Sequence, residues 1–322
     1  MARAIDSGDS VRAIRRTASA EPNHSLQLAS MAHMPAPSSC AEDFAAYLTI
    51  HKPLPRIVFA HTRYVYDSYR DYRRLVEVSG FPTCYLDECA WDDPDAAFIT
   101  TPPNGEFPYD RALTRKCKLV LWDLERPDSE GVRNVSESLH KFDGRVDAIW
   151  VSDRHYASLD GRYTFVPMGS DHRLRGSDSN PEPTYDFCHE SYVYGRRDAP
   201  FEALRRHLRE GPAGRRDGDR DELLHRSRLM VNVHQTPAAV GEPLRFALAA
   251  AYGLPLVSET LNDPFPMRPS EHFVMAPIDE VPGAVTRVLV SPDRPGLGRR
   301  LQQLLCDTLT FERCVKAAVS RL

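Results

Sequence analysis

The stretch that decides the fold covers residues 229–259 and reads LMVNVHQTPAAVGEPLRFALAAAYGLPLVSE. A short apolar run opens it, a polar loop follows, and an alanine-rich segment of helical composition leads to a second apolar run that ends in Ser258 and Glu259. A strand, a helix and a second strand in this order predict a parallel βαβ unit. Ligands of open parallel sheets bind outside the carboxyl ends of the strands. The loop between the first strand and the helix is therefore the expected place of function.

That loop and the start of the helix carry polar side chains. His234 and Gln235 end the first strand, Gly241 and Glu242 precede the helix, and Arg245 lies in its first turn. Backbone N–H groups at a helix N-terminus attract anions. An arginine there is disfavoured by the helix dipole unless an anion lies between the two. This combination predicts an anion site of the kind that a nucleotide diphosphate occupies.

Short apolar runs and helical segments alternate along the rest of the chain. The runs expected as strands are 57–60, 83–86, 97–100, 119–122, 148–152 and 164–166 in a first half, and 187–194, 229–234, 256–258 and 273–276 in a second. Helices are expected over 68–80, 199–210, 220–227, 247–252, 284–289, 298–305 and 313–322. This alternation predicts an α/β fold with two Rossmann-like domains, 56–175 and 176–322. Residues 1–55 are expected to form a flexible tail with at most one helix, around 41–50.

Composition and charge restrict the class of protein. Of the 322 residues, 42% are hydrophobic and 27% are charged, which is typical of a soluble globular chain. A net charge of -4 argues against a general polyanion binder. The seven cysteines form no CxxC pair, and the spacing of Cys84 and Cys89 is not a usual zinc pattern, so reduced thiols are expected. Because no apolar run approaches the roughly 18 residues of a membrane span, we expect a cytoplasmic protein without a transmembrane segment.

Four segments resemble the family-4-like, "group 1" glycosyltransferases, which have the GT-B fold. They read IWVSDRHYASLDGRYTFVPMGSD, YDFCHESYVYGRRDAP, LLHRSRLMVNVHQ and GEPLRFALAAAYGLPLVSE. The residues that match the family's motifs are Pro167, Gly169, Asp171, Gly195, Arg196, Arg197, Gly253, Pro255 and Ser258. The resemblance covers residues 56–322. It implies two domains facing across a cleft, with the acceptor bound to the first and the donor to the second.

The resemblance implies transfer of a sugar from a nucleotide-diphosphate sugar, with retention, without an obligatory metal and without a cofactor. The donor-binding residues that it implies, together with the polar strand ends, are Arg196, Arg197, His234, Gln235, Gly241, Leu244, Arg245, Ser258 and Glu259. Glu242 is the expected catalytic carboxylate, in contact with sugar hydroxyls. Negative charge develops on the departing diphosphate, and arginines can stabilise it through bidentate hydrogen bonds. Alternatively, Arg197 is a helix cap and Arg245 a structural ion pair with Glu242.

The chain also departs from the family's pattern. Glu242 lies two residues later than the usual position, and the family's ribose-binding acid falls at Leu248, which cannot accept a hydrogen bond. Ribose could then be held by Glu259 or by backbone. Two other functions stay open: a catalytically reduced GT-B protein that binds a nucleotide or glycan, and a sugar-nucleotide epimerase of the same fold.

Acceptor-side residues are expected where strands of the first domain end. His61 follows the first strand, Asn104 the third, and Asp123 and Glu125 the fourth. Glu125 is the expected base, since a carboxylate near the acceptor hydroxyl can take its proton. The acceptor itself stays open between a glycan, a lipid-linked molecule and a small molecule, with nucleic acid disfavoured by the acidic charge. The DxD pattern at 217–219 lies in a solvated charge run, so no metal site is expected there.

Overall fold

The computed structural model describes residues 40–63, 65, 69–101, 109–124, 144–159, 161–176, 182–190, 192–212, 219–237 and 241–322. Contacts among residues 40–322 make them one compact unit. The division of this unit into two domains at residue 176 stays a prediction. Most of the expected tail, residues 1–39, lies outside the described residues.

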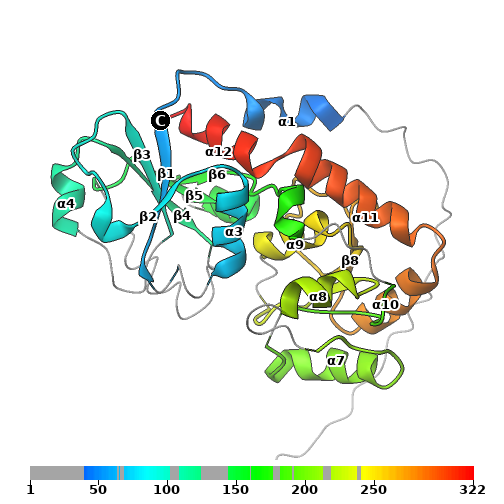
Figure 1. Ribbon diagram of the computed structural model, residues 1–322. Helices are drawn as coiled ribbons and strands as arrows, with labels where there is room; N and C mark the ends of the chain where they lie inside the picture. The colour runs from blue at the N-terminus through cyan, green and yellow to red at the C-terminus, as the bar shows by residue number, and fades with distance from the viewer. Residues whose placement is uncertain are drawn as a thin grey trace, which may run out of the picture. The chain divides into compact units, whose positions relative to one another are not determined.

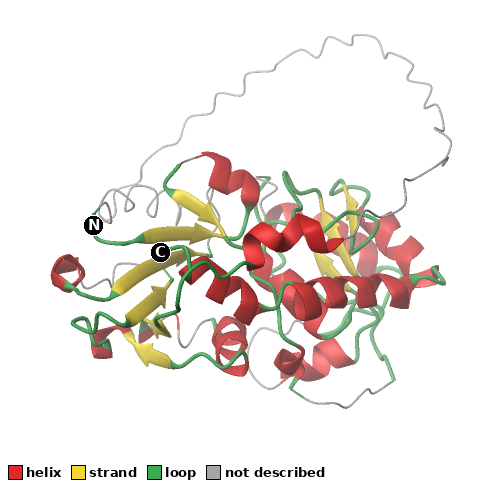
Figure 2. Cartoon of the chain, turned by 90° about the horizontal axis from the view of Figure 1, so that it is seen from above, coloured by secondary structure: helices red, strands yellow, loops and turns green. Residues whose placement is uncertain are grey.

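The first half of the unit is a parallel sheet of six strands in the order β2-β1-β3-β4-β5-β6 (Figures 1 and 2). The strands are β1(Arg56–His61), β2(Thr83–Tyr85), β3(Ala96–Thr100), β4(Lys118–Asp123), β5(Ala148–Val151) and β6(Tyr163–Phe165). The helical segments of this half are α3(Arg70–Val78), η1(Leu86–Glu88), α4(Tyr109–Thr114), α6(Arg154–Leu159) and η2(His172–Arg175). The six strands expected in this half are confirmed to within one or two residues. Their continuous apolar runs are buried because helices cover a parallel sheet on its faces.

The second half contains a three-stranded parallel sheet in the order β7-β8-β9. Its strands are β7(Met230–Asn232), β8(Leu256–Glu259) and β9(Val274–Ala276). The helical segments are η3(Gly195–Arg197), α7(Asp198–Arg205), α8(Asp219–His225), α9(Pro243–Ala251), α10(Val281–Val290), α11(Arg294–Gln302), η4(Gln303–Thr308) and α12(Phe311–Val319). The expected βαβ unit is confirmed as β7, α9 and β8. The helix begins at Pro243, which puts Arg245 in its first turn as expected and lengthens the expected range 247–252; the missing N–H of proline costs nothing at this first position.

The strand expected over 187–194 is wrong. Among the described residues of this range, 187–190 and 192–194, the pairing is limited to isolated bridges, between Phe187 and Glu210 and between Cys188 and Met230. Further along, the carbonyl oxygen of Tyr192 accepts a hydrogen bond from the guanidinium of Arg197 at 3.0 Å. The segment after Cys188 therefore leaves the sheet and carries its polar residues toward the carboxyl end of β7.

The first and last helices pack together against the first half (Figure 1). α1(Cys40–Leu48) buries Phe44, which is 1% exposed, and the Phe44 ring centroid lies 5.9 Å from that of Phe265. In α12, the Phe311 ring stacks on Trp122 of β4 with centroids 5.6 Å apart. The one helix expected in this part of the chain, around 41–50, is therefore present as α1. α12, which follows the second half in the chain, buries the Phe311 ring against the first sheet.

The turn after β6 ties several elements together through backbone contact. Gly169 has φ of +65°, and a β-carbon on it would collide with the backbone of Leu309 and Phe311. The next residue, Ser170, donates its hydroxyl to the carbonyl oxygen of Ala247 in α9 at 2.7 Å. Its carbonyl oxygen accepts from the backbone N–H of Phe311 at 3.0 Å. Only glycine combines this backbone conformation with so close an approach.

Candidate functional site

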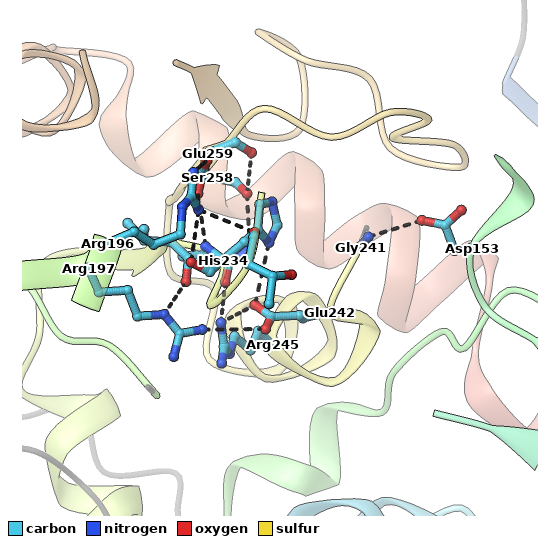
Figure 3. A network of polar contacts seen from close by, with 12 residues as sticks. Asp153, Arg196, Arg197, His234, Gly241, Glu242, Arg245, Ser258 and Glu259 are labelled. Carbon is cyan, nitrogen blue, oxygen red and sulfur yellow. Dashed lines mark hydrogen bonds and ion pairs between the residues drawn. The ribbon is translucent and has the colours of Figure 1, made fainter. Parts of the chain in front are cut away.

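Polar side chains gather at the carboxyl ends of β7 and β8 and at the N-terminus of α9 (Figure 3). Arg196, in η3, makes two hydrogen bonds to the carboxylate of Glu259, at 2.7 and 2.5 Å. The same guanidinium donates to the carbonyl oxygen of His234 at 2.9 Å. Glu259 also accepts the backbone N–H of His234 at 3.0 Å. The Arg196–Glu259 pair thus joins η3 to the ends of both strands, and both carboxylate oxygens of Glu259 are already engaged.

Arg245 is the second arginine of the site. It forms an ion pair with Glu242 and donates a 2.5 Å hydrogen bond to the side-chain oxygen of Asn232. Asn232 in turn donates to the hydroxyl of Ser258 at 3.0 Å. Burial lowers the pKa of Arg245 to about 10, so the guanidinium stays protonated at neutral pH. The alternative expected for Arg245, an ion pair with Glu242, is present in the structure.

Arg197 is almost completely buried, at 2% exposed. Its Nε donates to the carbonyl oxygen of Val233 at 2.8 Å, and its Nη2 lies 3.7 Å from a carboxylate oxygen of Glu242. His234 is 1% exposed, with its Nδ1 3.8 Å from the other oxygen of Glu242. Glu242 therefore lies between two arginines and a histidine.

The remaining expected donor residues surround this centre. Gln235 is exposed and donates to the hydroxyl of Tyr194, which is itself 53% exposed. Leu244 packs its side chain against the core. Gly241 donates its backbone N–H to Asp153, which follows β5 of the first sheet, at 3.0 Å. This last bond connects the loop before α9 to the carboxyl end of the six-stranded sheet (Figure 3).

One further carboxyl group lies in this region, on Glu190. Its side chain is 6% exposed, and one oxygen lies 2.8 Å from Nε of Arg220. Within the described part of the chain, the other oxygen is buried without a hydrogen-bond partner. Burial raises the pKa of Glu190 to about 8, and the charge of Arg245 opposes this only in part. Glu190 is therefore largely protonated near neutral pH.

Three arginines face two ionised glutamates at this centre, so the site carries one positive charge in excess while Glu190 is neutral. The diphosphate of a nucleoside-diphosphate sugar, two phosphates joined by an anhydride bond, carries two negative charges. Backbone N–H groups in the first turn of α9 add to the attraction, because a helix N-terminus has partial positive charge. At this site an anion could replace the Glu242 carboxylate as the ion-pair partner of Arg245.

The two acceptor-side candidates that the structure describes end strands of the first sheet. His61 is 1% exposed, and its ring centroid lies 5.8 Å from that of Tyr72. Burial and the charge of Arg73 lower the pKa of His61 to about 4, so its ring is neutral at neutral pH. Asp123 is 3% exposed at the end of β4. Asn104 and Glu125 lie outside the described residues.

A pocket adjoins the first turn of α9 and encloses about 430 Å³, including its opening to solvent. Its lining includes Asp153 and Met168 from loops that follow β5 and β6, Gly241 just before α9, Phe246 within α9, and Phe265. Asp263, another lining residue, accepts two hydrogen bonds from Arg154, at 2.7 and 3.1 Å. The pocket is mostly apolar and begins where the polar site ends.

The described residues contain neither a candidate metal centre nor a candidate membrane span. No group of three or more His, Cys, Asp or Glu side chains is placed there to hold a metal ion. None of the helices in this part of the chain is both long enough and apolar enough to cross a membrane. Residues 217 and 218 of the DxD pattern lie outside it.

Sequence reasoning missed four residues of this network: Asn232, Asp153, Glu190 and Tyr194. Asn232 is the one polar residue within the apolar run LMVNV, and this irregularity could have identified it. Asp153 directly follows an expected strand, as the residues chosen on the acceptor side do. Glu190 and Tyr194 were hidden by the wrong strand over 187–194.

Comparison with known proteins gives fold likeness without sequence likeness. No family model and no curated protein sequence matches the chain. Among solved structures, Anabaena HepE in complex with UDP and glucose superposes with TM-score 0.54 at 10% identity, over 83% of this chain and 100% of that chain. An alpha1,3-fucosyltransferase superposes with TM-score 0.51 at 10% identity, over 86% and 94%. TarM gives TM-score 0.46 at 8% identity, and the chain spans only 56% of its length. At such identities the likeness shows a shared α/β fold.

Proposed function

We propose that this chain is a glycosyltransferase of the GT-B type that uses a nucleotide-diphosphate sugar. The single observation that carries the proposal is the network at the N-terminus of α9, in which Arg197 and Arg245 pair with Glu242 beside the Arg196–Glu259 pair (Figure 3). The fold shared with an alpha1,3-fucosyltransferase supports it. Following the family resemblance, the proposal includes retention of configuration and independence of metal.

The donor's diphosphate would lie against the first turn of α9. Of the three arginines, Arg245 is the best phosphate ligand. A phosphate can replace Glu242 as its ion-pair partner, and this exchange leaves no other buried carboxylate without its arginine. Arg196 is tied to Glu259 by two hydrogen bonds and to the His234 carbonyl, so it serves to position the end of β7. Charge-assisted contacts of this kind become stronger as the leaving diphosphate gains charge.

Glu242 is the proposed catalytic carboxylate. When phosphate takes over Arg245, Glu242 keeps Arg197 at 3.7 Å and His234 at 3.8 Å as neighbours. These contacts hold its carboxylate at the N-terminus of α9, where it could accept hydrogen bonds from the sugar. The acceptor would enter from the carboxyl edge of the first sheet, which the Asp153–Gly241 bond brings beside this loop.

Release of nucleoside diphosphate from a panel of UDP- and GDP-sugars tests the proposal. Glu242→Gln should lower the release rate by at least about tenfold, because the charged acceptor of hydrogen bonds from the sugar becomes a neutral amide, with nearly unchanged donor affinity. Glu271→Gln is the matched control, because Glu271 is a half-buried glutamate that pairs only with nearby Arg268 and His272 among the described contacts. No release from any donor, or equal rates for both variants, would contradict the assignment.

A second function has one observation in its favour. Leu248 is 3% exposed in the core face of α9, where the resembled family has its ribose-binding acid, and Glu259 cannot replace that acid while Arg196 occupies it. A protein that binds a nucleotide without turnover would show this pattern. Donor binding with no release of nucleoside diphosphate under any condition would identify it.

A further inference from the structure

Two cysteines lie close together at the edge of the first sheet, away from the candidate site. Cys84 is in β2, and Cys89 directly follows η1. Their sulfur atoms are 3.6 Å apart, and both are free thiols. The sulfurs of a disulfide are about 2.05 Å apart, so a bond between these two requires about 1.5 Å of movement shared by two side chains.

The two thiols have different surroundings. Cys84 is half-buried and reachable from solvent, whereas Cys89 is 7% exposed and directs its sulfur toward the carbonyl oxygen of Tyr85 at 3.7 Å. The hydrogen bond between the thiols lowers the pKa of Cys84, and the same bond together with burial raises the pKa of Cys89. The nearby charges on Cys84 are Arg56, which favours its thiolate, and Glu88 and Asp87, which oppose it. An accessible thiol beside a buried one is the arrangement of an attacking and a resolving cysteine.

We propose that Cys84 and Cys89 are a thiol-oxidation site that closes to a reversible intramolecular disulfide. The oxidant is a low-molecular-weight disulfide. The Cys84 thiolate attacks one of its sulfurs, forming a mixed disulfide and releasing one thiolate. Cys89 then loses its proton and attacks the Cys84 sulfur, releasing the second thiolate. Two cysteine thiols are oxidised, and the small disulfide is reduced to two thiols.

The disulfide would fasten η1 to the end of β2. Cys84 pairs in register with Ala60 of β1, and the next pair is Tyr85 with His61. Within η1, Asp87 lies 3.6 Å from Arg63, whose guanidinium sits 4.4 Å from the centre of the Tyr85 ring. Oxidation would therefore stiffen the carboxyl end of β1 and β2. This inference does not depend on the proposed function.

Thiol mapping of the full chain tests this inference. The protein is equilibrated in buffers of increasing ratio of glutathione disulfide to glutathione, quenched with acid, alkylated with N-ethylmaleimide and digested with trypsin. Cys84 and Cys89 fall in one tryptic peptide, residues 75–111, because no lysine or arginine lies between Arg74 and Arg111. As the ratio rises, this peptide should lose both maleimide groups and become lighter by two hydrogens. Both cysteines alkylated at every ratio would overturn the proposal.

Single substitutions separate the two roles. Cys89→Ser should leave a glutathione adduct trapped on Cys84, whereas Cys84→Ser should leave Cys89 unmodified at the same ratios. Cys117→Ser is the matched control, because Cys117 is buried in the same core cluster as Cys89 and should not affect the disulfide. In the reduced protein, Cys84 should react with maleimide at least about tenfold faster than Cys89. A bond from Cys89 to Cys117 instead would overturn the proposal.

Discussion

At the scale of single residues, Glu190 shows how burial changes the chemistry of the site. Its carboxyl faces Arg220 of α8 on one oxygen, Arg245 of α9 lies near enough to act on it electrostatically, and Cys188 precedes it on its own segment. Burial raises the pKa from 4.5 to about 8, and the charge of Arg245 opposes this rise only in part. In the unfolded chain the same carboxyl ionises near 4.5, which makes Glu190 a source of pH-dependent stability.

We predict that Glu190→Gln lessens the decrease in stability that the parent shows as pH rises from 4.5 to about 8. Between pH 4.5 and about 8 the folded chain keeps a proton that the unfolded chain has released, so this group makes unfolding easier as pH rises through that window. The free energy of unfolding of the variant should equal that of the parent at pH 5. At pH 8 it should be higher by at least about 1 kcal/mol, since a shift of one pKa unit corresponds to about 1.4 kcal/mol. Thermal unfolding at both pH values measures this difference.

Glu202→Gln provides the control, because Glu202 is exposed in α7. It should leave the dependence of melting temperature on pH as it is in the parent. Identical pH dependence for Glu190→Gln and the parent would contradict the buried, protonated carboxyl.

The type of residue at the site could be predicted from the sequence, but the partner of each residue could not. A polar loop after a strand and an arginine in the first turn of a helix are local features, and they indicated Glu242 and Arg245, whereas Arg196 came from the family resemblance. Partners depend on tertiary contact: Glu259 is 63 residues from Arg196 in the chain. For that reason the sequence left Glu259 available for ribose, whereas the structure has Arg196 occupying it.

At the scale of elements, strands of the first sheet were predictable because each is a continuous apolar run bounded by polar residues. The second half is less regular. The run over 187–194 has strand-forming residues, but Val193 packs on the core while Tyr192 and Tyr194 stay 56% and 53% exposed. This alternation of buried and exposed side chains is typical of any extended segment, and it does not show whether another strand pairs with that segment. In the structure the Tyr192 carbonyl accepts a hydrogen bond from the guanidinium of Arg197, a tertiary contact that the sequence pattern does not reveal.

The turn at Gly169 leads to a prediction at this scale. Gly169→Ala should cost at least about 3 kcal/mol, because the strain of a left-handed residue, about 1–2 kcal/mol, adds to a collision with the backbone of Leu309 and Phe311. Gly80→Ala is the matched control: Gly80 has φ of +83° but no atom within 4 Å of its β-carbon position. Chemical denaturation of both variants measures the difference. Equal costs would contradict the close approach.

At the scale of the whole molecule, the first and last helices of the described unit, residues 40–322, are in contact with each other. α1 and α12 pack together, and His51 donates its backbone N–H to the hydroxyl of Ser320 at 3.0 Å. Composition alone made residues 1–55 resemble a tail, since α1 is short and rich in alanine. Its anchoring depends on Phe44 and Tyr47, whose rings meet Phe265 from a loop more than 200 residues away.

We therefore predict that Phe44→Ala destabilises the protein by about 3–5 kcal/mol, the usual cost of removing a buried phenylalanine. Ile50→Ala serves as control, because Ile50 is 54% exposed just beyond the same helix. Its substitution should change the free energy of unfolding by no more than about 0.5 kcal/mol. A small effect of Phe44→Ala would mean that residues 40–55 do not belong to the folded core.

The central claim is that the centre formed by β7, β8 and α9 binds a nucleotide diphosphate through Arg245. The most direct test is a thermal-shift panel of UDP, GDP, TDP, ADP and CMP with the parent, Arg245→Ala, Arg245→Lys and Arg300→Ala. Arg300 is the matched control, an arginine paired with Asp293 at 2.7 Å outside the site.

One nucleoside diphosphate should stabilise the parent and Arg300→Ala, by about 2.7 kcal/mol at 100 times its Kd. Arg245→Ala should bind at least about tenfold more weakly, the cost of losing one charge-assisted hydrogen bond, and Arg245→Lys should fall between. Melting without ligand shows whether each variant folds. No stabilisation of the parent by any nucleotide, or equal stabilisation of all four proteins, would contradict the claim.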